Sequence, residues 1–213
     1  MSDATPARWN LDMSTEERRS EILRSAAELL RDRQVSSLTM EAIADRLGMT
    51  KGNLYYYFRN KRELLYQCHL KGTDDSLRLL NEVAEFRASP GTRLRRLITS
   101  LVLAVTKDPY GQVLTTDLDS LSSAQRRHYV SLRDRFEKGV RQLVCEGIEF
   151  GEFQVRDVKL ASFAMLGAIN SIGTWYDSRG PSSPEQIAEQ YADFLIGGLE
   201  ARCASPRDDG PAR

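Results

Sequence analysis

The stretch GMTKGNLYYYFRNKRELL, residues 48–65, decides the architecture that the sequence predicts. Gly48 is placed to end one short helix in a left-handed conformation, and Thr50 is placed to cap the next. Apolar residues at helical spacing on 40–47 and 51–58 would hold the two helices against each other. Two short helices joined by a tight turn predict a helix-turn-helix unit.

Two further capping patterns frame this unit. Ser14 with Glu17 precedes an apolar stripe that predicts a first helix, and Asn60 with Glu63 opens the helix that follows the unit. These elements together predict a three-helix DNA-binding domain over residues 14–71.

Charge is distributed unevenly along the chain. The 213 residues contain 30 Lys plus Arg and 30 Asp plus Glu, so the formal net charge is zero. Within 46–71, however, six basic residues accompany one acid, Glu63, which gives +5. A local positive segment on a helix-turn-helix is typical of a DNA-binding surface, whatever the total charge.

The second helix of the unit offers side chains suited to DNA. A Lys reaches base edges or phosphates, an Asn pairs with adenine, and tyrosine hydroxyls bind phosphates. The candidates are Lys51, Gly52, Asn53, Tyr55, Tyr56 and Tyr57. Two structural alternatives remain open, since the tyrosines could serve inter-helix packing and the hairpin could be purely structural.

Residues 48–65, with LTMEAIADRLGM at 38–49 before them, resemble the DNA-binding signature of the tetracycline-repressor-type (TetR) family of bacterial regulators. The resemblance implies a homodimer with an all-helical ligand-binding body. Asn53 and Tyr56 occupy positions that vary in the family, which leaves the base sequence open. The residues implied to touch operator DNA are Thr39, Thr50, Lys51, Gly52, Asn53, Tyr55, Tyr56, Tyr57 and Lys61.

Beyond residue 72 the periodicity predicts longer helices and no strands, so the fold class is all-α. Pro and Gly breaks separate the expected elements, at 92–106, 110–118, 124–146, 158–177 and 184–201. We expect a ligand-binding and dimerisation domain over 72–203, with flexible tails at 1–13 and 204–213.

Residues 158–177 are apolar nearly all round, so protein must cover several faces of that helix. Pairing it and the last helix, 184–201, with their symmetry mates predicts a four-helix dimer interface. A monomeric core is the alternative.

The remaining faces predict a cavity for a small hydrophobic effector, with Arg133 available for an anionic group. The alternative for any single aromatic residue there is ordinary core. The expected apolar lining is Leu101, Val105, Leu114, Tyr129, Phe136, Met165, Ile169, Ile172, Trp175 and Tyr176.

Residues 146–200 are similar to one branch of the same family. The shared features are an EGxExGxF turn, a WY pair before a Gly-Pro loop and a QYxxxxxGGL ending. That branch includes repressors of fatty-acid, steroid and aromatic catabolism that respond to acyl-CoA thioesters, so the resemblance implies such an effector.

Other function classes find little support. Cys68, Cys145 and Cys203 have no close spacing and the two histidines are isolated, so we expect no metal site, no cofactor and a reducing cytoplasm. No run is long enough to span a membrane, the N-terminus lacks a signal-peptide layout, and nucleotide and hydrolase motifs are missing. The sequence therefore predicts a non-enzymatic, ligand-responsive repressor that binds a palindromic operator as a homodimer. The alternative is a small-molecule-binding protein or enzyme that uses the cavity without specific DNA binding.

Overall fold

The computed structural model describes residues 14–32, 39–113, 118, 119 and 121–200. Within these ranges the fold is all-α, as predicted, and the one β-type contact is an isolated bridge between Phe153 and Glu200. The helices are α1 Thr15–Asp32, α2 Met40–Arg46, α3 Lys51–Tyr57, α4 Lys61–Glu85, α5 Pro90–Lys107, α6 Pro109–Val113, α7 Ser123–Glu149, α8 Val158–Trp175 and α9 Pro184–Gly197.

In the head, by which we mean α1, α2, α3 and the start of α4, the predicted Thr50 cap of α3 is confirmed, and Thr39 caps α2. The Thr39 hydroxyl accepts from the Ala42 amide at 3.0 Å, and the Thr50 hydroxyl accepts from the Asn53 amide at 3.2 Å. Gly48 has φ 62°, the left-handed conformation that lets the chain turn sharply between α2 and α3.

The capping pair at the start of α4 differs from the expectation in one half. Asn60 accepts from the Glu63 amide at 2.9 Å, as predicted. The Glu63 carboxylate, however, accepts from the Arg59 amide at 2.9 Å and not from that of Asn60. The amide of Arg59, the residue before the N-cap, thus makes the second capping hydrogen bond. The start of α4 is still stabilised by the side chains of both Asn60 and Glu63.

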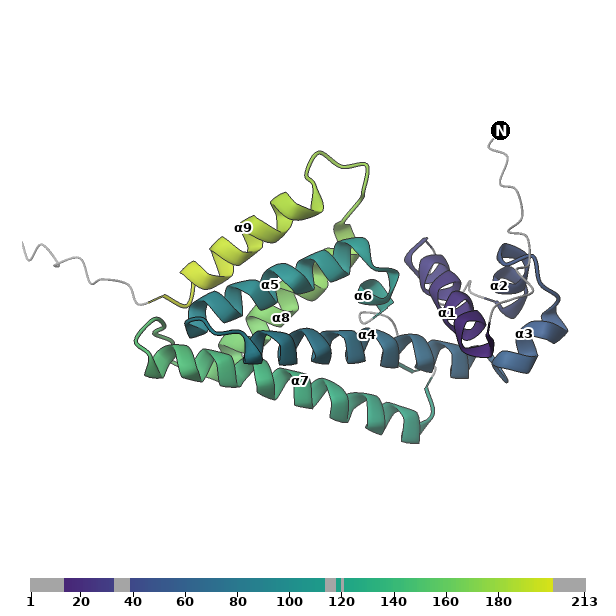
Figure 1. The fold of residues 1–213 in the computed structure, drawn as a ribbon, viewed down its shortest axis with the longest axis horizontal. Coiled ribbons are helices and arrows are strands. Elements are labelled where there is room, and N and C mark those ends of the chain that lie inside the picture. Colours follow the sequence, from purple (N-terminus) through teal and green to yellow (C-terminus); the bar gives the residue numbers. More distant parts are fainter. Residues whose placement is uncertain (1–13, 33–38, 114–117, 120, 201–213) are drawn as a thin grey trace, which may run out of the picture.

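Two hydrophobic clusters organise the described chain. The head is built around buried residues of α1 to α4, including Ile22, Ile43, Leu54 and Phe58. The larger cluster joins α4, α5, α7, α8 and α9, and we call this part the body. Figure 1 shows the head at one end of the molecule and the body extending from it along α4.

The long helix α4 belongs to both parts. Its first turns pack in the head through Leu64, Leu65 and Cys68, and its later turns pack in the body through Leu80 and Val83. The expected domain limit at 71/72 falls inside this unbroken helix, so that limit stays a proposal. Any rotation of α4 against the body carries the head with it.

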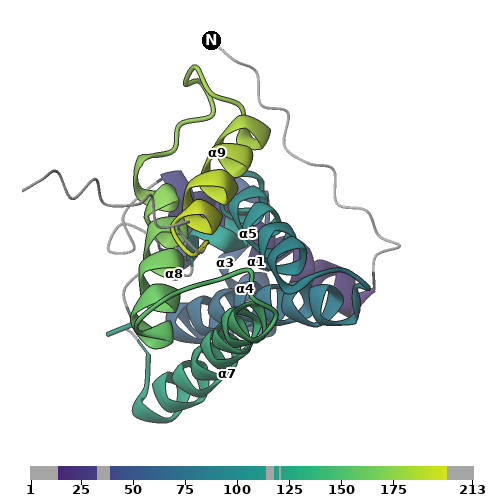
Figure 2. The same ribbon diagram turned by 90° about the vertical axis from the view of Figure 1, so that its left-hand side faces the viewer.

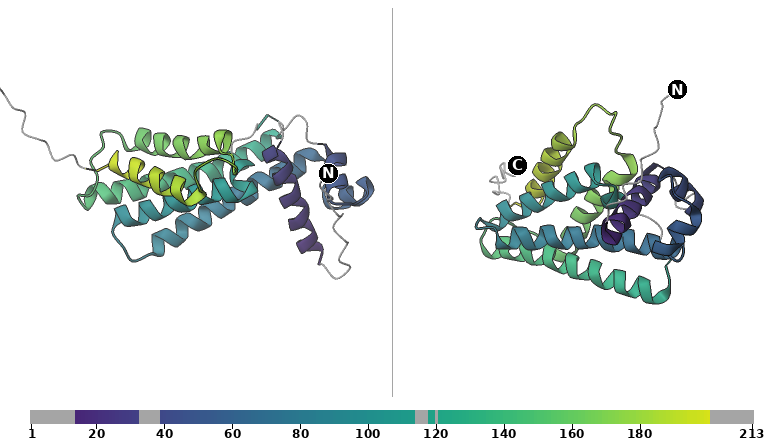
Figure 3. Two further views of the ribbon diagram at one scale, coloured as in Figure 1. Left: turned by 90° about the horizontal axis from the view of Figure 1, so that it is seen from above. Right: turned by 45° about the vertical axis from the view of Figure 1, so that its right-hand side comes forward.

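The body helices run side by side along the long axis. Seen from its end, α4, α5, α7 and α8 surround a centre, and α9 covers α5 from outside (Figure 2). Viewed from above, α8 lies along one side of the body, and α9 crosses over α5 (Figure 3). α6 covers Pro109–Val113, and residues 114–117 of the helix expected to reach 118 lie outside the described residues. α9 ends at Gly197, before the expected 201.

Candidate functional site: a DNA-binding surface and an effector cavity

The α3 helix has one buried side and one exposed side. Leu54 and Phe58 are fully buried against the head core. Tyr55 and Tyr56, in contrast, are 42 % and 76 % exposed. The alternative that the tyrosines serve inter-helix packing therefore does not hold for Tyr56, whose ring is available to a partner.

The remaining predicted DNA contacts lie on or beside the same exposed side. Thr39, Thr50, Lys51, Gly52 and Asn53 are exposed, whereas Tyr57 and Lys61 are half-buried. A Cβ added at Gly52 would meet no protein atom within 4 Å, so this part of α3 has open space in front of it. That space allows a groove to approach the backbone of α3 closely.

Arg19 of α1 fixes the C-terminal end of α3, a role that sequence reasoning missed. Its guanidinium donates to the Tyr57 carbonyl at 2.7 Å and lies 4.4 Å from the centroid of the Phe58 ring. A bond from a charged donor to a helix-end carbonyl is stronger than a neutral one. The sequence held no signal for it, because Arg19 is one of several charged residues in α1.

Lys51 forms an ion pair with Glu41 of α2, and both side chains are largely exposed. The hydrogen bond between them lowers the pKa of Glu41 and raises that of Lys51. Glu41 thus occupies Lys51 in the same way that a DNA phosphate would.

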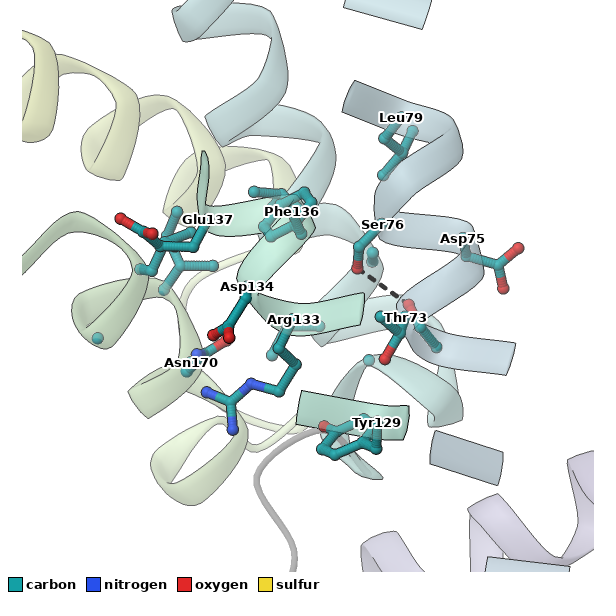
Figure 4. Close-up of a pocket in the computed structure, with 18 of the residues that line it drawn as sticks. Thr73, Asp75, Ser76, Leu79, Tyr129, Arg133, Asp134, Phe136, Glu137 and Asn170 are labelled. Atoms are coloured by element: carbon teal, nitrogen blue, oxygen red, sulfur yellow. Dashed lines mark hydrogen bonds between the residues drawn. The ribbon is translucent and has the colours of Figure 1, made fainter. Parts of the chain in front are cut away.

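A cavity of about 720 Å³ lies in the body between α4, α5, α6, α7 and α8 (Figure 4). Six of the predicted lining residues do line it: Leu101, Val105, Tyr129, Arg133, Phe136 and Ile169. Leu114 lies outside the described residues.

Four predicted lining residues lie elsewhere, which corrects the expected cavity wall. Met165 and Ile172 are buried in the body core, and Tyr176 follows the end of α8 and packs at the edge of that core. Trp175 is half exposed and stacks on Tyr191 of α9 with ring centroids 6.4 Å apart. The reason is the rotation of α8, which turns a different stripe to the cavity, namely Lys159, Phe163, Leu166 and Asn170.

Sequence reasoning also missed the α4 wall of the cavity. Gly72, Thr73, Asp75, Ser76 and Leu79 line it. Small polar residues on a helix resemble a solvated face, and the expected change of pattern near residue 72 hid the continuity of α4. The long helix in the structure brings these residues opposite α7.

Charged groups also line the cavity on α7 and at the start of α8, in addition to the polar residues of α4. Lys138, Arg141 and Lys159 line the cavity together with the acids Asp134 and Glu137. Arg141 forms an ion pair with Glu137 one turn away, its Nε donating at 3.1 Å. With Arg133 the lining has four cations, and with Asp75 and Asp108 it has four acids, beside its apolar residues.

Two contacts connect the cavity region to the head. Tyr110 of α6 lines the cavity and is also a member of the head cluster, with its hydroxyl 3.5 Å from the Ser20 carbonyl of α1. Tyr66 of α4 is hydrogen-bonded to the Nδ1 atom of His128 in α7, at 2.5 Å. A change in the cavity wall can thus reach the head through α6 and α4.

Comparison with known proteins agrees with both halves of this arrangement. Residues 22–68 match the family model "Bacterial regulatory proteins, tetR family". Residues 87–199 match the model "Tetracyclin repressor-like, C-terminal domain". The chain belongs to the TetR family of transcriptional regulators. One model thus matches the head of the regulator, and the other matches its body.

Among its relatives is the HTH-type transcriptional repressor KstR2 of Mycobacterium tuberculosis, 28 % identical over 186 residues that cover 85 % of this chain and 92 % of the relative. The TetR family regulator PfmR from Thermus thermophilus, which has a crystal structure, is 30 % identical in sequence. The match has a TM-score of 0.76 and covers 84 % of this chain and 99 % of PfmR. A second solved structure is that of AibR in complex with isovaleryl coenzyme A and operator DNA, whose sequence is 26 % identical to this one. The match has a TM-score of 0.75 and covers 86 % of this chain and 98 % of AibR. In sequence and architecture this TetR-family chain is thus similar to regulators of which one, AibR, has been seen with both a coenzyme A thioester and operator DNA.

No helix in the described part of the chain is long and apolar enough to cross a membrane. The same residues contain no group of three or more His, Cys, Asp or Glu side chains that could hold a metal ion.

Proposed function

We propose that this regulator is a homodimeric repressor that binds a palindromic operator in the cytoplasm. The observation that carries the proposal is the two-sided α3 helix, with its apolar side fixed in the head and its polar side open. Such a helix enters the major groove, where its side chains reach base edges and phosphates. The proposed contacts are Thr39, Thr50, Lys51, Gly52, Asn53, Tyr55, Tyr56, Tyr57 and Lys61.

The dimer is proposed to form through α8 and α9. Leu160 and Phe194 are large apolar side chains on these helices that remain substantially exposed, and Phe194 is 81 % exposed. Exposed apolar surface of this kind favours a protein interface. A two-fold axis there would place two heads on one side of the DNA, about 34–36 Å apart when the half-sites are one turn apart.

The effector is proposed to be a thioester of coenzyme A with a hydrophobic acyl group. The apolar interior would hold the acyl group, and Lys138, Arg141 and Lys159 would attract the phosphates at the edge. The AibR structure supports this class, since that relative binds isovaleryl coenzyme A together with operator DNA.

Release of DNA would follow from a change in the cavity wall. Tyr110 contributes to both the cavity and the head core, and α4 extends from one to the other. An effector that fits one arrangement of α4 and α6 better than another shifts the population toward the arrangement with weaker DNA binding.

The proposal is tested by titrating the full-length protein against fragments of its own promoter region at several salt concentrations. We expect a specific complex whose log affinity falls linearly with log salt, and release by a panel of acyl-CoA thioesters. Specific binding to no genomic fragment would contradict the repressor proposal. Ligand binding in the cavity without any specific DNA complex would favour the alternative of a small-molecule-binding protein.

A further inference from the structure

One end of the cavity is polar, although most of its wall is apolar. Thr73 and Ser76 of α4 and Tyr129 of α7 contribute hydroxyl groups to this end (Figure 4). The Thr73 hydroxyl donates to the His69 carbonyl at 2.8 Å, and the Ser76 hydroxyl donates to the Gly72 carbonyl at 2.9 Å. Both protons are therefore used within α4, and neither hydroxyl is a free donor toward a ligand.

Tyr129 differs from its two neighbours. Its side chain is fully buried, and its hydroxyl makes no hydrogen bond of normal distance and angle with any described residue. Burial raises the pKa of Tyr129, and this effect outweighs the lowering by the charge of Arg133 and by the Thr73 hydroxyl. The phenol thus keeps its proton at neutral pH and remains a donor without a good acceptor, an arrangement that costs free energy in a buried site.

The surroundings of Tyr129 restrict what the acceptor can be. The His69 ring lies 4.9 Å away, centroid to centroid, and burial lowers the pKa of His69 to about 4, so it is neutral. Arg133 lies over the Tyr129 ring at 5.8 Å from the centroid, while Asp134 lines the cavity one residue further on. A ligand carboxylate at the buried hydroxyl would lose its hydration. The cavity lining already has as many acidic as basic side chains, so no excess positive charge offsets that loss, and a neutral oxygen is favoured.

We propose that the effector's hydrophobic group carries a neutral oxygen acceptor, of which a ketone is the simplest, and that Tyr129 donates a hydrogen bond to it. This inference rests on the cavity being the effector site. Arg133 is exposed and covers the ring with a flexible side chain, so it can move aside as a ligand fills this end. Tyr129 would then discriminate oxygenated ligands from purely hydrocarbon ligands of the same shape.

The test compares two neutral probes of matched shape, 4-tert-butylcyclohexanone and 4-tert-butyl-1-methylenecyclohexane, by calorimetry on the full-length protein. We expect the wild type to bind the ketone about tenfold more tightly, the size of effect of one good hydrogen bond. Tyr129→Phe should bind both probes alike. Tyr191→Phe, which alters a tyrosine outside the cavity, should keep the wild-type preference.

A second pair of measurements separates ligand recognition from a structural role. Because the hydroxyl lacks a partner, Tyr129→Phe should melt at the same temperature as the wild type or higher. In the wild type alone, the carbonyl stretch of the bound ketone should shift to lower frequency than in an alkane solvent. No ketone preference in the wild type, including no binding of either probe, overturns the inference, as does an unchanged preference in Tyr129→Phe. Failure of acyl-CoA thioesters to release DNA, with the ketone preference intact, would instead contradict the effector class proposed above.

Discussion

Gly111→Ala is the most direct perturbation of the connection between cavity and head. A Cβ at Gly111 would lie 2.6 Å from the Ala104 carbonyl oxygen and 2.8 Å from the Val105 Cα atom. Both are backbone atoms of α5, which cannot rotate away as a side chain can. Ordinary contact begins at 3.4 Å, so α6 must move by about 0.8 Å.

That displacement should loosen the head. The Tyr110 hydroxyl is already 3.5 Å from the Ser20 carbonyl, so a movement of this size away from α1 breaks the contact. We expect the free energy of unfolding to fall by about 1–3 kcal/mol, as is typical when a packed site is overfilled. Operator affinity without effector should also fall, because the altered wall imitates the ligand-bound state.

The assay combines denaturant unfolding with operator titration, and Gly167→Ala is the matched control. Gly167 also lines the cavity, but a Cβ there would meet nothing within 4 Å, so the control should keep its operator affinity and gain stability of at most about 1 kcal/mol. If Gly111→Ala is destabilised while its operator affinity and effector response match the wild type, α6 does not transmit the signal and the reasoning fails.

Three further predictions follow from the head and from α4. Lys51→Ala should weaken operator binding and reduce the slope of log affinity against log salt by about one, measured by fluorescence anisotropy; an unchanged slope removes Lys51 from the phosphate contacts. Glu41→Gln should raise affinity for DNA of any sequence by up to about fivefold, because the carboxylate no longer competes for Lys51; a fall in affinity would show that Glu41 orients the lysine instead. Burial lowers the pKa of His69 from 6.5 to about 4, so protonation favours the unfolded state; stability should be complete above pH 6.5 and decrease toward pH 4 by up to about 3 kcal/mol. His69→Asn should flatten this pH dependence in denaturant unfolding, whereas His128→Asn, at an exposed position, should retain it.

The sequence predicted the head well because its determinants are local. Thr39 and Thr50 cap helices whose first turns lie within three residues of them, and Gly48 needs only its own backbone conformation. The alternation of buried Leu54 and exposed Tyr56 also follows directly from the helical period. Arg19 could not be predicted in the same way, since its partner at Tyr57 is 38 residues away.

The cavity was predicted less completely because helix rotation is set by tertiary packing. An α8 that is apolar on every side has no preferred inward face in its sequence, so Met165 and Trp175 were as plausible as Phe163 and Leu166. The continuity of α4 has the same origin. Its polar residues near Thr73 become a cavity wall only because α7 packs across them.

The position of Tyr110 constrains how effector and operator influence each other. One side chain cannot serve two independent sites, so an effector that displaces it changes the head, and DNA that holds the head restricts the cavity. Thermodynamic linkage requires the two effects to be equal in free energy. Allosteric proteins typically show coupling of about 1–3 kcal/mol, which corresponds to about 5- to 150-fold. The affinity for an acyl-CoA thioester should therefore be lower on the operator complex than on the free protein by the same factor as the operator is weakened by that thioester. Unequal factors, measured in one buffer, would mean that the effector acts at a further site or changes the oligomeric state.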